Sequence, residues 1–153
     1  EPRTWVESLL WHHACHTVDL FCWLLDETDV EVWGQRGPDH PQLGIPMDMT
    51  VAMRSRQRGT LLTMAMSFNN KGPFGGFYRY IGEEETYRAF RDELSDSEGK
   101  PVDVPQALPA FEAQDAEFIA ALKEGRPSRC DIASVLPAMR ALDRIDRIMH
   151  GKD

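Results

Sequence analysis

MDMTVAMRSRQRGTLLTMAMSF, residues 47–68, contains two runs in which large and small side chains alternate. Alternation with a period of two is typical of β-strands whose two faces have different surroundings. The intervening Gln57-Arg58-Gly59 is a turn, so the segment predicts a β-hairpin. One face is rich in methionine and should carry helices. The other face is small and nearly flat, and it consists of Thr50, Ala52, Thr63, Ala65 and Ser67. A second sheet can lie against such a surface, which predicts a homodimer or a higher homo-oligomer.

The segments before and after this hairpin predict further helices and strands, and together they indicate an α+β fold. Residues 8–25 lack Gly and Pro and carry apolar side chains at helical spacing, so a largely buried helix is expected. Further strands are expected at 30–37, 77–81 and 86–94, and helices at 112–124 and 134–149, the last with Ser134 as N-cap. The predicted architecture is an open, mainly antiparallel sheet with helices packed on one face and the other face available for dimerisation.

Size, charge and cysteine content limit the class of protein. The 153 residues, 42% apolar and 27% charged, are enough for one globular domain. A net charge of −8 with scattered basic residues argues against a nucleic-acid partner. No apolar run approaches the roughly 20 residues of a membrane span, so no membrane partner is expected. Cys15, Cys22 and Cys130 lack CxxC spacing, which predicts free thiols in a reducing cytoplasm.

LLWHHACHTVDLFCWLL, residues 9–25, carries the most informative polar groups. At about 100° per residue, one narrow stripe of the expected helix contains His12, His16, Asp19 and Trp23. His13 and Cys15 are expected to point to other faces. A solvated face normally carries Lys, Glu and Arg, so the stripe is expected to face a cleft or a satisfied interior network.

The residues alone leave three interpretations of this stripe open. A histidine has a pKa near 6.5 and can act as a general acid or base, while Asp19 can orient His16 or raise its basicity. Alternatively, the two histidines form a buried pair that hydrogen-bonds within the core. Thirdly, His12 and His16 have the i, i+4 spacing of two zinc ligands. The glutamate of HExxH is missing, however, and only Asp19 is a nearby third ligand, so no metal site is predicted.

The same stretch resembles the start of the C-terminal domain of the Gfo/Idh/MocA oxidoreductases. In that family a helix carries D-x-x-x-H followed by D three residues later, and the spacing of His16 and Asp19 matches. The resemblance implies that His16 accepts the proton of a substrate hydroxyl while the nicotinamide of NADP or NAD accepts the hydride. His12 stands where the family has the aspartate. This departure removes a negative charge and argues for an anionic substrate in place of a simple sugar or polyol.

A narrower resemblance extends along the chain, in RTWVESLLWHHACHTVDLF (3–21), HPQLGIPMDMT (40–50), SFNNKGPFGGFYRYI (67–81) and EFIAALKEGRP (117–127). These segments are similar to dehydrogenases of aromatic-acid degradation that oxidise a dicarboxylate hemiacetal with NADP. The similarity implies a small anionic carboxylate substrate.

Five residues are nominated as substrate ligands. Arg3 could bind a carboxylate through two hydrogen bonds and Trp5 could reach the same cleft, although a terminal arginine is often simply exposed. Asn69 and Asn70 precede a Gly-Pro segment, where side chains can project over a site, but they are also common turn formers. Arg79 is either a cation that faces the ligand or an ion-pair partner of the acidic run 83–85.

No G-x-G-x-x-G follows a predicted strand, so the sequence lacks the dinucleotide-binding fingerprint. The nucleotide-binding Rossmann domain and catalytic lysine of the family would then lie before Glu1, and residues 1–153 would form the C-terminal substrate-binding and dimerisation domain. On this interpretation the 153 residues alone are expected to be inactive and to contact a nicotinamide only marginally. A non-catalytic ligand-binding or dimerisation module is the alternative.

Overall fold

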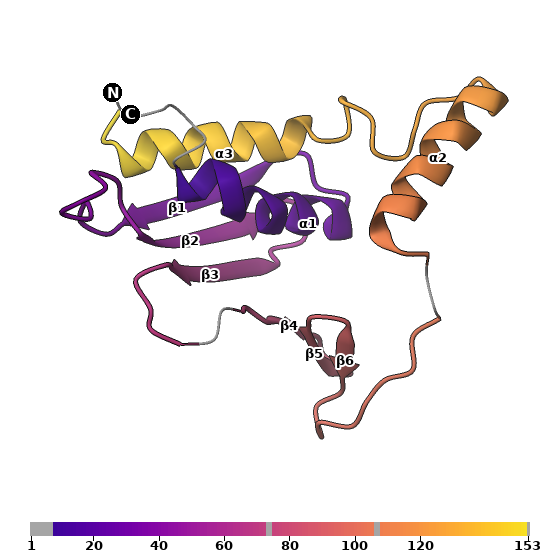
Figure 1. The fold of residues 1–153 in the computed structure, drawn as a ribbon, viewed down its shortest axis with the longest axis horizontal. Helices are drawn as coiled ribbons and strands as arrows, with labels where there is room; N and C mark the ends of the chain where they lie inside the picture. Colours follow the sequence, from indigo (N-terminus) through magenta and orange to yellow (C-terminus); the bar gives the residue numbers. More distant parts are fainter. Residues whose placement is uncertain (1–7, 73–74, 106–107, 153) are drawn as a thin grey trace. The chain divides into compact units, whose positions relative to one another are not determined.

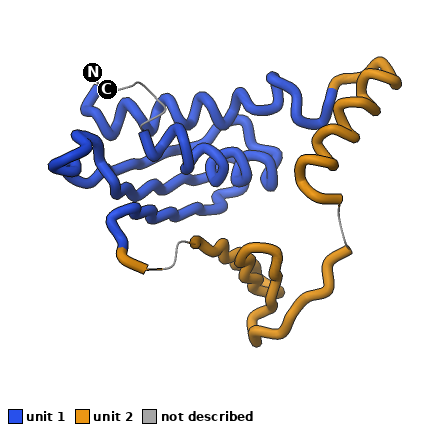
Figure 2. The backbone as a smooth tube through the Cα atoms, in the orientation of Figure 1, with its two compact units in different colours: residues 1–70, 128–153 blue, residues 71–127 orange. Residues whose placement is uncertain are grey.

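The computed structural model describes residues 8–72, 75–105 and 108–152, and the chain divides into two compact units (Figures 1 and 2). The first unit comprises residues 1–70 and 128–153, and the second comprises residues 71–127. Each unit has its own three-stranded antiparallel sheet among the described residues, whereas the sequence suggested one sheet.

The sheet of the first unit contains β1 (Val30–Arg36), β2 (Asp48–Ser55) and β3 (Leu61–Ser67), in the order β1-β2-β3. The predicted hairpin is confirmed, because β2 and β3 pair antiparallel with Met53 opposite Leu62. On β2 the side chains alternate as expected: Met49, Val51 and Met53 are buried. β2 is central because it pairs with β1 on one edge and with β3 on the other.

Two helices, α1 (Cys15–Leu25) and α3 (Leu136–Met149), cover the methionine-rich face of this sheet (Figure 1). The fully buried side chains at their contact include Val18 of α1, and Leu142 and Ile145 of α3. The N-cap expected at Ser134 is wrong, because α3 begins at Leu136 and the Ser134 hydroxyl instead donates to the carbonyl of Asp131 at 2.7 Å. The first unit therefore has two layers, with its core between the helices and the sheet.

The helix expected over residues 8–25 is present, but it begins with a π-helical turn, η2 (Leu10–Ala14). The amide of Cys15 donates to the carbonyl of Leu10, five residues back instead of the usual four. The buried side of the helix nevertheless follows the predicted apolar spacing through Leu10, Ala14 and Val18. The wider turn lies at the predicted functional residues, which is where such turns often occur in proteins.

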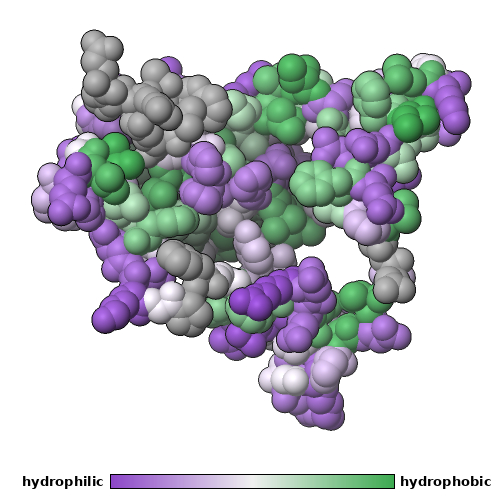
Figure 3. All heavy atoms as spheres, in the orientation of Figure 1, coloured by the Kyte–Doolittle hydropathy of each residue, from purple (hydrophilic) through white to green (hydrophobic). Residues whose placement is uncertain are grey.

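The second unit contains β4 (Tyr78–Ile81), β5 (Thr86–Phe90), β6 (Glu93–Ser95) and α2 (Ala110–Glu124). The single strand predicted over residues 86–94 is wrong. Arg91 adopts the left-handed conformation with φ 55°, and the chain reverses there to pair β6 with β5. The helix predicted at 112–124 is confirmed and ends at Gly125, whose φ of 63° suits glycine. Apolar side chains of α2 reach the surface (Figure 3).

The fold class predicted from the sequence is confirmed, since helices and antiparallel sheets form an open α+β arrangement. The small face of the first sheet is also as expected, with Thr50, Thr63 and Ala65 exposed. None of the helices in the described part of the chain is both long and apolar enough to span a membrane.

Candidate active site

The histidine segment forms a cluster of imidazole rings at the junction of η2 and α1. The rings of His12 and His13 lie 4.4 Å apart between centroids, and the ring of His13 lies 4.7 Å from the ring of Phe68, just after β3. The expectation that His13 points away from His12 is therefore wrong. Phe68 belongs to the side chains packed against the core, so it gives the cluster a fixed support.

The predicted stripe lies on the accessible side of the helix. His12 and His16 are exposed, Trp23 is 69% exposed and Asp19 is half-buried. Neither the His12 imidazole nor the His16 imidazole forms a hydrogen bond with a residue in the described ranges. The interpretation of these histidines as a buried, hydrogen-bonded pair is therefore wrong. Their ring nitrogens are free to bind a ligand or to exchange a proton.

Burial and neighbouring charges shift the pKa values of two side chains at the cluster, His13 and Cys22. Partial burial lowers the pKa of His13, and the nearby His12 and His16 lower it further. Burial also raises the pKa of Cys22 to about 11, helped by the charge of Asp19, so this thiol stays protonated near neutral pH. The chemistry that the cluster can perform is consequently proton transfer by imidazole, with no thiolate nucleophile at Cys22.

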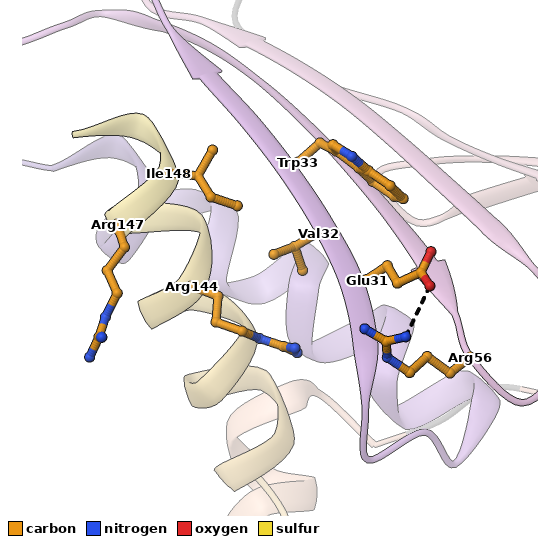
Figure 4. A pocket seen from close by; sticks show the side chains of 7 residues that line it. All are labelled: Glu31, Val32, Trp33, Arg56, Arg144, Arg147 and Ile148. Carbon is orange, nitrogen blue, oxygen red and sulfur yellow. Dashed lines mark hydrogen bonds and ion pairs between the residues drawn. The ribbon is translucent and has the colours of Figure 1, made fainter. Parts of the chain in front are cut away.

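Two cavities lie in the first unit. One, of about 350 Å³, is lined by Glu31, Val32, Trp33, Arg56, Arg144, Arg147 and Ile148. Figure 4 shows Arg144 extending from α3 toward β1, and Arg56 paired with Glu31. Neither this cavity nor a second one beside Asp143 is lined by a histidine. The histidine cluster therefore lies apart from these two cavities.

A metal centre finds no support in the described parts of the chain, where no three His, Cys, Asp or Glu side chains are arranged to hold an ion. All strand pairs in the described residues are antiparallel, so they contain no strand-turn-helix unit of the parallel type that cradles a pyrophosphate.

The nominated substrate ligands fall in different places. Arg3 and Trp5 lie outside the described residues. The Asn69 amide donates to Asp48 at 2.6 Å, which joins the ends of β2 and β3. Asn70 is exposed, and Arg79 lies on β4 of the second unit. Among the predicted site residues, His12, His16 and Asp19 lie on the same helical segment, η2 and α1.

Two residues near the site escaped prediction. His13 was set aside because neighbours in a helix face different directions, yet its ring lies 4.4 Å from that of His12. Phe68 was recognised only as a core residue of β3, yet its ring contacts His13. A signal for Phe68 existed: it continues the alternation of Leu62, Met64 and Met66 on the helix-covered face.

Sequence comparison places this geometry in a family. A profile described as bacterial oxidoreductases, C-terminal, matches residues 1–107, more than half of the chain. The chain belongs to this family. A curated member, the 4-carboxy-2-hydroxymuconate-6-semialdehyde dehydrogenase of Sphingobium sp. (strain NBRC 103272 / SYK-6), is 44% identical over 149 residues, covering 95% of this chain and 47% of that protein. The chain thus spans about half the length of this relative.

Solved structures with the same fold are oxidoreductases of the Gfo/Idh/MocA type. The aldose-aldose oxidoreductase of Caulobacter crescentus, complexed with glycerol, matches with a TM-score of 0.82 and 16% identity over 100% of this chain and 50% of that one. The WlbA dehydrogenase of Bordetella pertussis, in complex with NADH and UDP-GlcNAcA, matches with a TM-score of 0.71 and 18% identity over 95% of this chain and 44% of that one. At these identities the similarity establishes the fold of this oxidoreductase domain.

Proposed function

We propose that this chain is the substrate-binding and oligomerisation half of a dehydrogenase that uses NADP or NAD. The observation that carries the proposal is the 44% identity to a named dehydrogenase over nearly the whole chain, with an exposed histidine cluster at its N-terminal helix. The fold relatives include a dehydrogenase in complex with NADH, which supports a nicotinamide as cofactor.

His16 is proposed as the general base. Its imidazole is exposed and forms no hydrogen bond with described residues, so it is available to a substrate hydroxyl. Asp19 lies one turn further along the same helix, in position to orient the charged imidazole. The hydride leaves for a nicotinamide that residues outside this chain would bind. The 153 residues alone are therefore expected to be inactive and to bind NADPH weakly.

The proposed substrate is the cyclic hemiacetal of 4-carboxy-2-hydroxymuconate-6-semialdehyde, which is oxidised to 2-pyrone-4,6-dicarboxylate in aromatic-acid degradation. Support comes from the name of the relative and from His12. An imidazole at this position does not repel a dicarboxylate as an aspartate would. Another sugar or polyol dehydrogenase of the same family is the alternative, and it predicts activity on neutral hydroxyl compounds instead.

A homodimer or higher homo-oligomer is proposed to form through the small face of the first sheet. Thr50, Thr63 and Ala65 on this face are exposed, and Trp33 beside them on β1 is 51% exposed. Small side chains allow two sheets to approach closely, and a half-exposed indole supplies apolar area for a contact. A non-catalytic module would share this surface but would not need His16.

The test is a turnover assay of the longest natural polypeptide that contains these residues. Reduction of NADP and of NAD is followed spectroscopically with the dicarboxylate hemiacetal and, separately, with neutral sugars and polyols. We expect His16→Asn to lower kcat by roughly 10²–10⁴, and His40→Asn, a matched change in the loop before β2, to leave it unchanged. Normal folding of both variants is verified by circular dichroism. Undiminished turnover by His16→Asn would remove its assignment, and preference for a sugar would favour the alternative.

A further inference from the structure

Two arginines face each other across the sheet of the second unit. Arg79 of β4 and Arg88 of β5 are directly opposite in the antiparallel register, and both are exposed. Directly opposite residues have Cβ atoms about 4.5–5.5 Å apart, and like charges in that arrangement destabilise a sheet. A sheet this small has little stability to lose, so an unfavourable pair calls for a compensating role.

Neither arginine has a carboxylate partner within the described ranges. The acidic run at 83–85 was the alternative partner of Arg79, but Glu85 accepts hydrogen bonds from the amides of Thr86 and Ser97 instead. Glu93 shares the face, opposite Phe90, yet forms no ion pair with Arg79 or Arg88. The chain carries a net charge of −8, yet these two neighbouring guanidinium groups have no ion-pair partner among the described residues.

Aromatic rings hold one of these groups in place. The guanidinium carbon of Arg88 lies 5.2 Å from the ring centroid of Phe77 and 5.4 Å from that of Phe90. Such cation–π contacts fix the plane of the guanidinium while leaving its N–H edge free to donate. Phe77 is itself 60% exposed, so a flat apolar surface adjoins the two cations.

We infer that Arg79 and Arg88, with Phe77 beside them, bind the carboxylate of a small planar conjugated acid. Arg88 donates two parallel N–H bonds to the carboxylate, Arg79 supplies the second positive charge, and the ring of Phe77 stacks on the conjugated body. The sequence left Arg79 as either a ligand-facing cation or an ion-pair partner, and this inference assigns it the first role. Arg88, which the sequence analysis did not nominate, shares that role. The inference rests on the proposed function only in naming the substrate class.

Binding is tested on the 153-residue chain without any cofactor, so the outcome is separate from that of the turnover assay. The probe is isophthalate, a planar aromatic dicarboxylate, titrated by calorimetry and by NMR of the arginine side-chain N–H groups. Neutral isophthalamide, saturated hexahydroisophthalate and inorganic phosphate are titrated in parallel. We expect isophthalate to shift the Arg88 signal and to bind at least several-fold more tightly than each of the three.

Variants locate the site. Arg79→Gln and Arg88→Gln should each weaken isophthalate binding by roughly tenfold or more, as expected for loss of a charged hydrogen-bond donor. Arg140→Gln, which changes an exposed arginine of α3, is the matched control and should leave binding unchanged. Arg79→Gln should not lower the melting temperature, because it relieves a like-charge pair.

Three results would overturn the inference. The first is isophthalate binding that survives both glutamine substitutions. The second is phosphate or hexahydroisophthalate binding as tightly as isophthalate, which would identify a general anion site. The third is a clear loss of thermal stability in Arg79→Gln, which would identify a structural role. Turnover of a full-length enzyme without isophthalate binding would leave the proposed function intact and reject this site alone.

Discussion

Gly34 of β1 lies directly against Ile145 of α3, so closely that a Cβ on Gly34 would be 2.9 Å from Ile145 Cγ2. The branched Ile145 side chain is fully buried and stiff at χ1, so it has little room to move aside. The absence of a side chain at Gly34 therefore allows α3 to lie close to the sheet.

Gly34→Ala is expected to destabilise the fold by about 1–3 kcal/mol, the usual effect of overpacking a core. The reduced entropy of the unfolded chain offsets less than about 1 kcal/mol of this loss. Urea unfolding followed by circular dichroism measures the change. Gly72→Ala is the control, since a Cβ there meets nothing within 4 Å. Equal stability of the two variants would contradict the close contact.

Glu27 connects the end of α1 to the β2–β3 turn. Its buried carboxylate accepts hydrogen bonds from the Ser55 hydroxyl and from the amides of Thr28 and Asp29. The bond from Ser55 holds the pKa of Glu27 below its ordinary value, and the backbone amides lower it further against the opposing effect of burial.

A lowered pKa means that Glu27 stabilises the folded state above the ordinary pKa of a glutamate, and that this contribution is lost as the pH falls through the lowered value. We expect Glu27→Gln to be less stable than the parent protein at neutral pH, with the difference shrinking in acid. The free energy of unfolding in urea, measured from neutral to acidic pH, tests this. Glu83→Gln, an exposed change, should show no such trend. A difference that is constant with pH would reject the explanation.

The sequence predicted those parts of the fold that depend on local pattern. Alternation in residues 47–68 predicted β2 and β3 with the correct buried face, because a strand that is covered on one side alternates along its length. Gly125 marked the end of α2 for a similarly local reason, its left-handed φ. Neither feature requires knowledge of distant residues.

The parts of the fold that the sequence did not predict depend on local backbone conformations that the residue types do not indicate. The reversal at Arg91 places a non-glycine residue at positive φ, so no Gly or Asn marked the end of β5. The π-helical turn at Leu10–Ala14 has no marker in the sequence, and the contact between the His12 and His13 rings was not predicted either. His16 and Asp19, which lie beyond that turn in a regular helix, kept their predicted spacing.

The pKa of His13 should lie below the ordinary value for histidine. Partial burial lowers its pKa first, and His12 and His16 lower it further, so the folded state favours the neutral ring. NMR of the imidazole carbons across the pH range should give a midpoint below 6.5. His12→Gln should move this midpoint upward, whereas His40→Gln should not. An unchanged midpoint in His12→Gln would show that the two rings are not coupled.

The same shift makes folding depend on pH. Because the folded pKa of His13 is lowered, its contribution is fully present above the ordinary value of 6.5 and declines as the pH falls toward the folded value. His13→Phe removes the titration and keeps a ring against Phe68. We expect this variant to lose less stability than the parent between neutral and mildly acidic pH, measured as melting temperature. A parallel decline of both proteins would contradict the prediction.

The small face of the first sheet should be sensitive to charge if it joins two copies of the chain. Ala65 of β3 lies opposite Thr50 of β2 at the centre of this face, and both are exposed. Ala65→Glu would place like charges against each other at a twofold contact and bury them without partners, which costs several kcal/mol in an interface. Light scattering across a concentration series should therefore report a dimer or larger assembly for the parent protein and a monomer for the variant.

Thr60→Glu adds the same charge in the exposed β2–β3 turn and should keep the parent mass. A parent chain that stays monomeric at every concentration would remove this face as an interface, while equal loss of mass in both variants would point to net charge as the cause.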